Sequence, residues 1–106
     1  MKIDKSRLTT LQAQMKSVIE SGSATIENNI IYMIGHQYTY TEDNGIITIE
    51  CITDPFILKM KDNENDIELL EGFCNGHKSK SDKTLNKFAR IASALYVFME
   101  TKKQMK

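Results

Sequence analysis

Apolar side chains recur with a helical period near the start of the chain, and this pattern predicts a helix over residues 4–21. Asp4 stands where its carboxylate can accept hydrogen bonds from the free amides of a first turn. Gly22 supplies the left-handed stop that commonly ends a helix. The apolar residues fall on one side only, so we expect this face to lie on a core. They are Leu8, Leu11, Met15, Val18 and Ile19.

Residues 24–73 change to short β-rich runs separated by turn residues, of which Asn44-Gly45 gives the clearest signal. A two-residue turn there pairs Tyr38 with Cys51 and Tyr40 with Ile49. This register places apolar side chains on one face of both strands and polar ones on the other, and a one-residue slip would destroy the separation. Asn28-Asn29 predicts a second tight hairpin, because asparagine tolerates positive φ.

The segment after the Asp54-Pro55 turn alternates over residues 56–60 and predicts another strand. Residues 67–74 allow two interpretations. As a strand, the segment puts Ile67, Leu69 and Phe73 on one side, but Glu71 then joins them. As a helix it groups Ile67, Leu70 and Cys74 instead. We expect a strand that closes a hairpin with 56–60, and a helix remains the alternative.

The last predicted helix covers residues 84–102, after a basic loop over 76–83 and before a frayed tail over 103–106. Its apolar stripe takes up about half of the circumference, so it is either packed on two sides or shared with a second subunit. The whole chain, 1–106, therefore reads as one α+β domain. We predict an antiparallel sheet of four to six strands, a meander of hairpins, flanked by an N-terminal and a C-terminal helix.

The formal charge of the 106 residues sums to zero, but its distribution is uneven. Residues 42–71 carry nine acidic and two basic groups, and residues 78–106 carry eight basic and two acidic groups. A uniformly basic or uniformly acidic protein is therefore excluded, and we expect a molecule with oppositely charged ends.

The bulk composition fits a soluble cytoplasmic domain. No apolar run approaches the roughly 18 residues of a membrane span, and the charged N-terminal residues do not resemble a signal peptide. In the cytoplasm the two cysteines stay reduced. The abundance of Ile and Lys is typical of an AT-rich genome, such as that of a low-GC bacterium, a phage or another mobile element.

Two cysteines and two histidines form the only candidate metal set. The hairpin register brings His36 diagonal to Cys51, and Cys74 and His77 are spaced as Cys-x-x-His. The alternative, which we favour, is that the cysteines are small buried hydrophobic residues and the histidines are surface residues. A Cys–His nucleophile pair needs a partly exposed thiolate, whereas Cys51 falls on the predicted core face.

Other catalytic patterns are weaker still. The acidic run from Asp62 to Glu71 lacks the glycine of a calcium-binding loop and is better explained as a solvated turn. The sequence contains no phosphate-binding glycine loop and no Ser/His/Asp arrangement. We therefore expect no catalytic residues, no metal, no cofactor and no enzymatic activity.

Basic residues near the C-terminus are the best candidates for contacts with nucleic acid. They would bind phosphates without sequence preference and with strong salt dependence. A solvated helix face explains the same pattern, since no arginine cluster or aromatic stacking platform accompanies them. The residues are Lys78, Lys80, Lys83, Lys87 and Arg90.

No family resemblance reaches the level of a motif. The order of helices and strands is similar to that of dimeric type III secretion chaperones, provided that residues 64–74 are helical, and to that of small helix–sheet–helix nucleoid proteins. We predict a small non-enzymatic protein-binding module (an adaptor, inhibitor or regulatory protein) that acts as a homodimer. The alternatives are a nucleic-acid-binding protein and a secretion-chaperone-like protein. The predicted partner or dimer interface consists of Ile91, Leu95, Tyr96, Phe98 and Met99.

Overall fold

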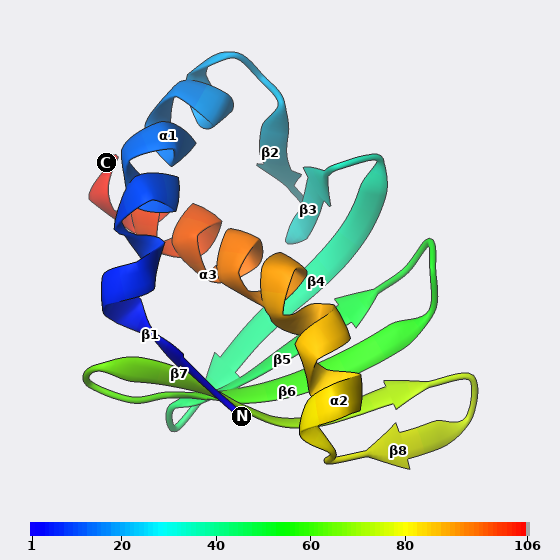
Figure 1. Ribbon diagram of the computed structural model, residues 1–106. Coiled ribbons are helices and arrows are strands. Elements are labelled where there is room, and N and C mark those ends of the chain that lie inside the picture. Colours follow the sequence, from blue (N-terminus) through cyan, green and yellow to red (C-terminus); the bar gives the residue numbers. More distant parts are fainter. Residues whose placement is uncertain (106) are drawn as a thin grey trace.

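Helices cover one face of an antiparallel sheet in the computed structural model, which describes residues 1–105 (Figure 1). The helical segments are η1 (Lys5–Leu8), α1 (Thr9–Glu20), α2 (Asp82–Leu85), η2 (Asn86–Phe88) and α3 (Ala89–Gln104). The strands are β1 (Lys2–Asp4), β2 (Ala24–Glu27), β3 (Ile30–Met33), β4 (His36–Asp43), β5 (Ile46–Cys51), β6 (Phe56–Asp62), β7 (Asp66–Cys74) and β8 (His77–Ser79).

The predicted α+β meander with flanking helices is confirmed, but the sheet has eight strands rather than four to six. Its order is β1-β7-β6-β5-β4-β3-β2, and β8 also pairs with β7. The two unpredicted strands, β1 and β8, have three residues each, which is too short for a pattern of alternation to be visible in the sequence. β8 occupies part of the predicted basic loop 76–83.

The N-terminal helix begins as predicted at Asp4, whose side chain accepts a hydrogen bond from the Ser6 amide at 2.9 Å. The first turn is 3₁₀ rather than α, and the α-helix proper starts at Thr9. Gly22 follows the helix at φ +80, as its left-handed stop requires.

Two predicted hairpins form with the expected register. Tyr38 pairs with Cys51 and Tyr40 with Ile49 around the Asn44-Gly45 turn. Asn28 and Asn29 both adopt positive φ and join β2 to β3. Inward side chains such as Ile31, Tyr38 and Ile49 are buried, so the separation of apolar from polar positions set the register, as argued from the sequence.

Residues 66–74 form the strand β7, and a β-bulge explains why this segment was ambiguous. Met60 pairs with Leu69 and Lys59 with Glu71, so Leu70 is an extra residue in the ladder. Before the bulge, Leu69 faces the core; after it, Gly72 faces the core and Glu71 faces outward. No strand with a constant period could reconcile these positions. A helix over 64–74, on which the similarity to secretion chaperones depended, is not present.

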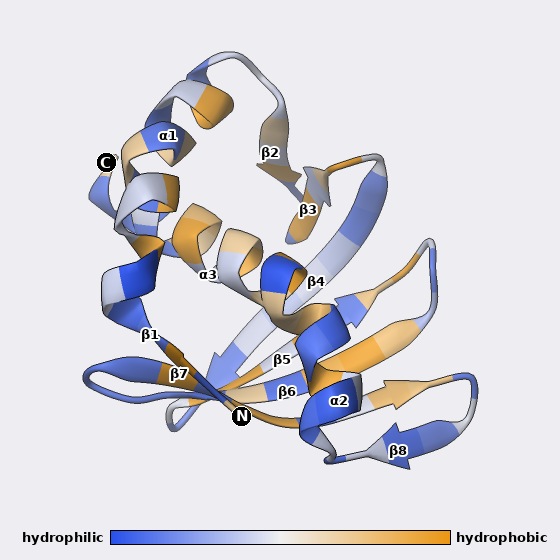
Figure 2. Cartoon of the chain, in the orientation of Figure 1, coloured by the Kyte–Doolittle hydropathy of each residue, from blue (hydrophilic) through white to orange (hydrophobic). Residues whose placement is uncertain are grey.

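The last helix packs on two sides within the single chain. α3 lies between the sheet and α1 (Figure 1), and its inward side chains are fully buried, including Leu95 and Phe98. Apolar residues follow the surfaces that α3 and the sheet present to each other (Figure 2). Two short helical segments precede α3: α2 and then the 3₁₀ turn η2. The Ser81 side chain caps α2 by accepting a hydrogen bond from the Thr84 amide. Lys106, the end of the predicted tail, lies outside the described residues.

Among residues 1–105, no helix combines the length and the apolarity that crossing a lipid bilayer would require.

Candidate functional site

The sheet face turned away from the helices carries an apolar patch on β6 and β7. Ile57 and Phe73 are register partners, and the Phe73 ring is 40% exposed. Lys59 and Glu71 form the next outward pair, and Lys78 of β8 lies opposite Phe73. Together these side chains line a shallow hollow of about 220 Å³. We call this surface the outer patch: Ile57, Lys59, Glu71, Phe73 and Lys78.

Charged groups frame the apolar centre of the outer patch. Lys78 Nζ lies 3.4 Å from Glu71 Oε2, and Lys59 adds a second positive charge. A further hollow of about 240 Å³ continues past Phe73 toward Pro55 and Gly76. The centre can bury an apolar side chain while the rim hydrogen-bonds or pairs with polar groups, which is the usual anatomy of a protein-contact surface.

The β-bulge creates this patch. Without the extra Leu70, the alternation set by Ile67 and Leu69 would turn Phe73 into the core. The bulge reverses the phase, and Gly72 then faces inward under the Phe88 ring, where a Cβ would lie 2.9 Å from a ring carbon. The sequence did contain a signal, since Glu71 conflicted with a strand of constant period, but it did not show which residue would be inserted.

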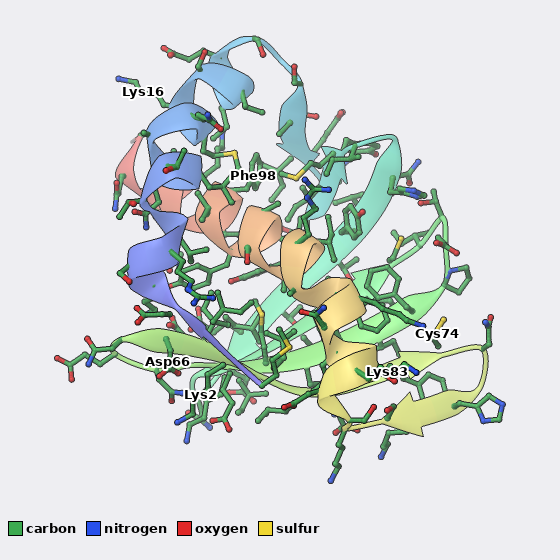
Figure 3. All side chains as sticks on the ribbon, viewed as in Figure 1. Lys2, Lys16, Asp66, Cys74, Lys83 and Phe98 are labelled. Carbon is green, nitrogen blue, oxygen red and sulfur yellow. The ribbon has the colours of Figure 1, made fainter. Side chains whose placement is uncertain are left out.

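The predicted dimer interface on the last helix is not a free surface. Leu95, Tyr96 and Phe98 are buried in the monomer core, and Ile91 and Met99 are half-buried against it. Figure 3 shows Phe98 among the side chains between α3 and the elements around it. The breadth of the apolar stripe is explained by packing on both the sheet and α1, so it no longer indicates a second subunit.

Tyr96 instead takes part in a polar cluster that holds the N-terminal segment to the sheet. Asp62 Oδ1 accepts hydrogen bonds from Lys5 Nζ at 2.7 Å and from the Tyr96 hydroxyl at 3.2 Å. Burial raises the pKa of Tyr96. Burial alone would lower the pKa of Lys5, but hydrogen bonds and charge interactions with Asp62 and Tyr96 raise it overall. The cluster is a structural link between η1, the β6–β7 turn and α3.

The four residues of the candidate zinc set do not converge. The strand register places four residues side by side on adjacent strands, in the order Cys51, Phe56, Cys74 and His77. The Phe56 ring therefore separates the two cysteines. Strands lie about 4.8 Å apart, which puts the cysteine backbones roughly 10 Å apart, whereas a Zn–S bond is about 2.3 Å. Within residues 1–105 no group of three or more His, Cys, Asp or Glu side chains is arranged to hold a metal ion.

Cys51 and His36 are connected only through a threonine. Thr53 Oγ1 lies 2.8 Å from His36 Nδ1 and 3.7 Å from Cys51 Sγ. The Asp54 amide donates to the same sulfur at 3.3 Å, and the thiol is 2% exposed. These contacts stabilise the β5–β6 turn.

The predicted nucleic-acid contacts lie along β8 and the start of the last helix. All five side chains are exposed, and only Lys78 has an ion-pair partner among the described residues. Lys83, Lys87 and Arg90 are spaced to share one side of the helix. Lys83 projects from α2 in Figure 3, and α2 and β8 form a hydrophilic corner in Figure 2. The complete set is Lys78, Lys80, Lys83, Lys87 and Arg90.

Comparison with known proteins finds no matching family model and no similar curated protein or solved structure.

Proposed function

We propose that the protein is a small non-enzymatic protein-binding module, an adaptor, inhibitor or regulator, whose contact surface is the outer patch. The observation that carries the proposal is the outward register pair Ile57 and Phe73, which lines a hollow framed by Lys59, Glu71 and Lys78. An outward phenylalanine contributes nothing to the core, so its burial in a partner accounts for its position better than folding does.

The composition of the outer patch supports a protein as its ligand. Aromatic side chains at the centre of a contact surface supply much of the binding free energy, and a polar rim excludes water around them. The hollow of about 220 Å³ is smaller than the roughly 300–1,000 Å³ typical of small-molecule sites. It therefore suits a single side chain of a protein partner.

The experiment compares wild type with Phe73→Lys and with a control that adds the same charge elsewhere on the outward face, Thr41→Lys. Each purified protein is immobilised and exposed to an extract of the native host, and retained proteins are quantified. We expect a defined set that wild type and Thr41→Lys retain and that Phe73→Lys loses. Equal retention by all three proteins would contradict the proposal, provided that circular dichroism shows all of them folded.

Nucleic-acid binding is the second candidate function, favoured by the exposed basic corner, in which four of the five cations have no ion-pair partner in the described chain. Duplex DNA and single-stranded RNA would then bind at low salt and be released as salt rises. Replacing Lys83, Lys87 and Arg90 with glutamine should weaken that binding for every sequence tested. No binding at low salt would exclude this function.

A further inference from the structure

The β3–β4 turn contains a residue that folding alone does not explain. Among residues 1–105, five residues other than glycine have positive φ, and four of them are asparagines. The fifth is Ile34, at φ +55. Asparagine tolerates this conformation, whereas a β-branched side chain is strained in it.

The hairpin turns of the same sheet provide an internal comparison. Asn44-Gly45 and Asn75-Gly76 use the sequence that two-residue hairpins prefer, while the equivalent turn between β3 and β4 is Ile34-Gly35. The Ile34 side chain is 68% exposed and takes no part in the core. Neither the backbone nor the packing of the monomer favours isoleucine here.

Neighbouring side chains extend the apolar character of this turn. Ile52, in the adjacent β5–β6 turn, is 46% exposed, and its amide donates to the Gln37 carbonyl at 2.8 Å. Tyr32 is also exposed on the outward face. We call Tyr32, Ile34 and Ile52 the apolar tip.

Charge distinguishes the apolar tip from the outer patch. No lysine or arginine occurs between Lys16 and Lys59, a stretch that contains six acidic residues, among them Asp54 next to the tip. The outer patch carries Lys59 and Lys78 against the single Glu71. The apolar tip, with Asp54 in the same turn as Ile52, is thus complementary in polarity and charge to an apolar hollow whose rim carries Lys59 and Lys78.

We propose that a second copy of this chain covers the outer patch by placing Ile34 in the hollow, against Ile57 and Phe73. The inference rests on the proposed function in taking the outer patch as a protein-contact surface, and it identifies the occupant. Each chain carries both a tip and a hollow, so a two-fold dimer makes the contact twice. Anionic membranes and nucleic acids are poor occupants for the tip, because β3, β4, β5 and the turns that carry the tip contain no lysine or arginine.

Sedimentation velocity over a range of concentrations tests the proposal with the protein itself as the probe. Wild type and the outward-face control Thr41→Lys should dimerise. Ile34→Asn and Phe73→Lys should each weaken dimerisation by roughly a hundred- to ten-thousandfold, because each variant loses both contacts and leaving one large apolar side chain unburied accounts for about ten- to a hundredfold. At a protein concentration low enough for wild type to be monomeric, Ile34→Asn should also raise the thermal unfolding midpoint by roughly 4–8 °C, because it removes the strain and leaves the core unchanged.

Mixing the two variants gives the decisive result. Ile34→Asn keeps the hollow and Phe73→Lys keeps the tip. A dimer with one chain of each variant can therefore make one of the two contacts, whereas a dimer of either variant alone can make neither. We expect the mixture to associate more strongly than either component.

Either of two outcomes overturns the inference: wild type that stays monomeric at all concentrations, or a mixture that associates no better than its folded components. In both cases, retention of host proteins that depends on Phe73 would still support the proposed function. Failure of this inference is therefore distinguishable from failure of the proposed function.

Discussion

The Lys5–Asp62–Tyr96 cluster allows a quantitative prediction about how the N-terminal segment is held. Lys5 Nζ and Asp62 Oδ1 are 2.7 Å apart, and their side chains are 26% and 21% exposed. Exposed ion pairs contribute about 0–1 kcal/mol and hydrogen bonds to charged groups about 1.5–3 kcal/mol. Since most of each side chain is covered, we expect Asp62→Asn to lower the free energy of unfolding by about 1.5 kcal/mol.

A double-mutant cycle isolates the interaction. Lys5→Met keeps a side chain of similar length and removes the ammonium group, whose nitrogen lies 5.4 Å from the centroid of the Tyr96 ring. Urea unfolding of wild type, both single variants and the double variant should give a coupling energy of about 1 kcal/mol. The matched control is Lys103 with Glu100, 3.6 Å apart on an exposed surface of α3, for which we expect a coupling energy below about 0.5 kcal/mol.

Salt separates the two pairs further. The Debye length falls to about 3 Å at 1 M salt, which screens the exposed pair far more than the covered one. A coupling energy between Lys5 and Asp62 no larger than that of the control, or one that vanishes in salt, would refute the assignment of this cluster as a structural link.

Three further predictions follow from packing and protonation. Gly72→Ala should lower the free energy of unfolding in urea by about 1–3 kcal/mol, because its Cβ would lie 2.9 Å from the Phe88 ring. Adding Phe88→Leu to this variant should recover part of the loss, and wild-type stability of Gly72→Ala would disprove this packing. Burial raises the pKa of Tyr38, Tyr40 and Tyr96 above the ordinary value of 10.0, and the pKa of Lys5 is also raised by its partners. All four groups therefore hold protons longer in the folded state, so their contribution to stability should be constant below about pH 10. It should fall as pH rises further, and less steeply in Tyr40→Phe; no fall in stability between about pH 10 and pH 11 would contradict this. A thiol reagent should label the half-buried Cys74 in the native protein and the buried Cys51 only on unfolding, and equal labelling rates would show that the β5–β6 turn opens readily.

The β4–β5 hairpin was predictable because two independent signals agreed. Asn44-Gly45 fixed the turn, and the alternation on both strands allowed only one register around it. The segment 66–74 was not predictable in detail, because one inserted residue at the bulge changes which face every later side chain occupies. The Phe73 surface depends on that insertion.

The last helix shows a different limit of sequence reasoning. The width of its apolar stripe correctly required two packing partners, but periodicity cannot say whether a partner belongs to the same chain. Here the sheet and α1 supply both sides, which buries Leu95 and Phe98. The Ile34-Gly35 turn was missed for the opposite reason, since isoleucine is not a turn-forming residue.

The sheet pairs the earliest strand with one of the last, and this has a consequence for synthesis on the ribosome. The central strands pair with their neighbours in sequence, so hairpins can form as they emerge. β1 must wait for β7, and α1 for α3, with the Leu69 amide donating to the Met1 carbonyl at 2.7 Å. We expect the meander to assemble first, while the N-terminal segment stays undocked and open to proteases or chaperones until the final helix has been made.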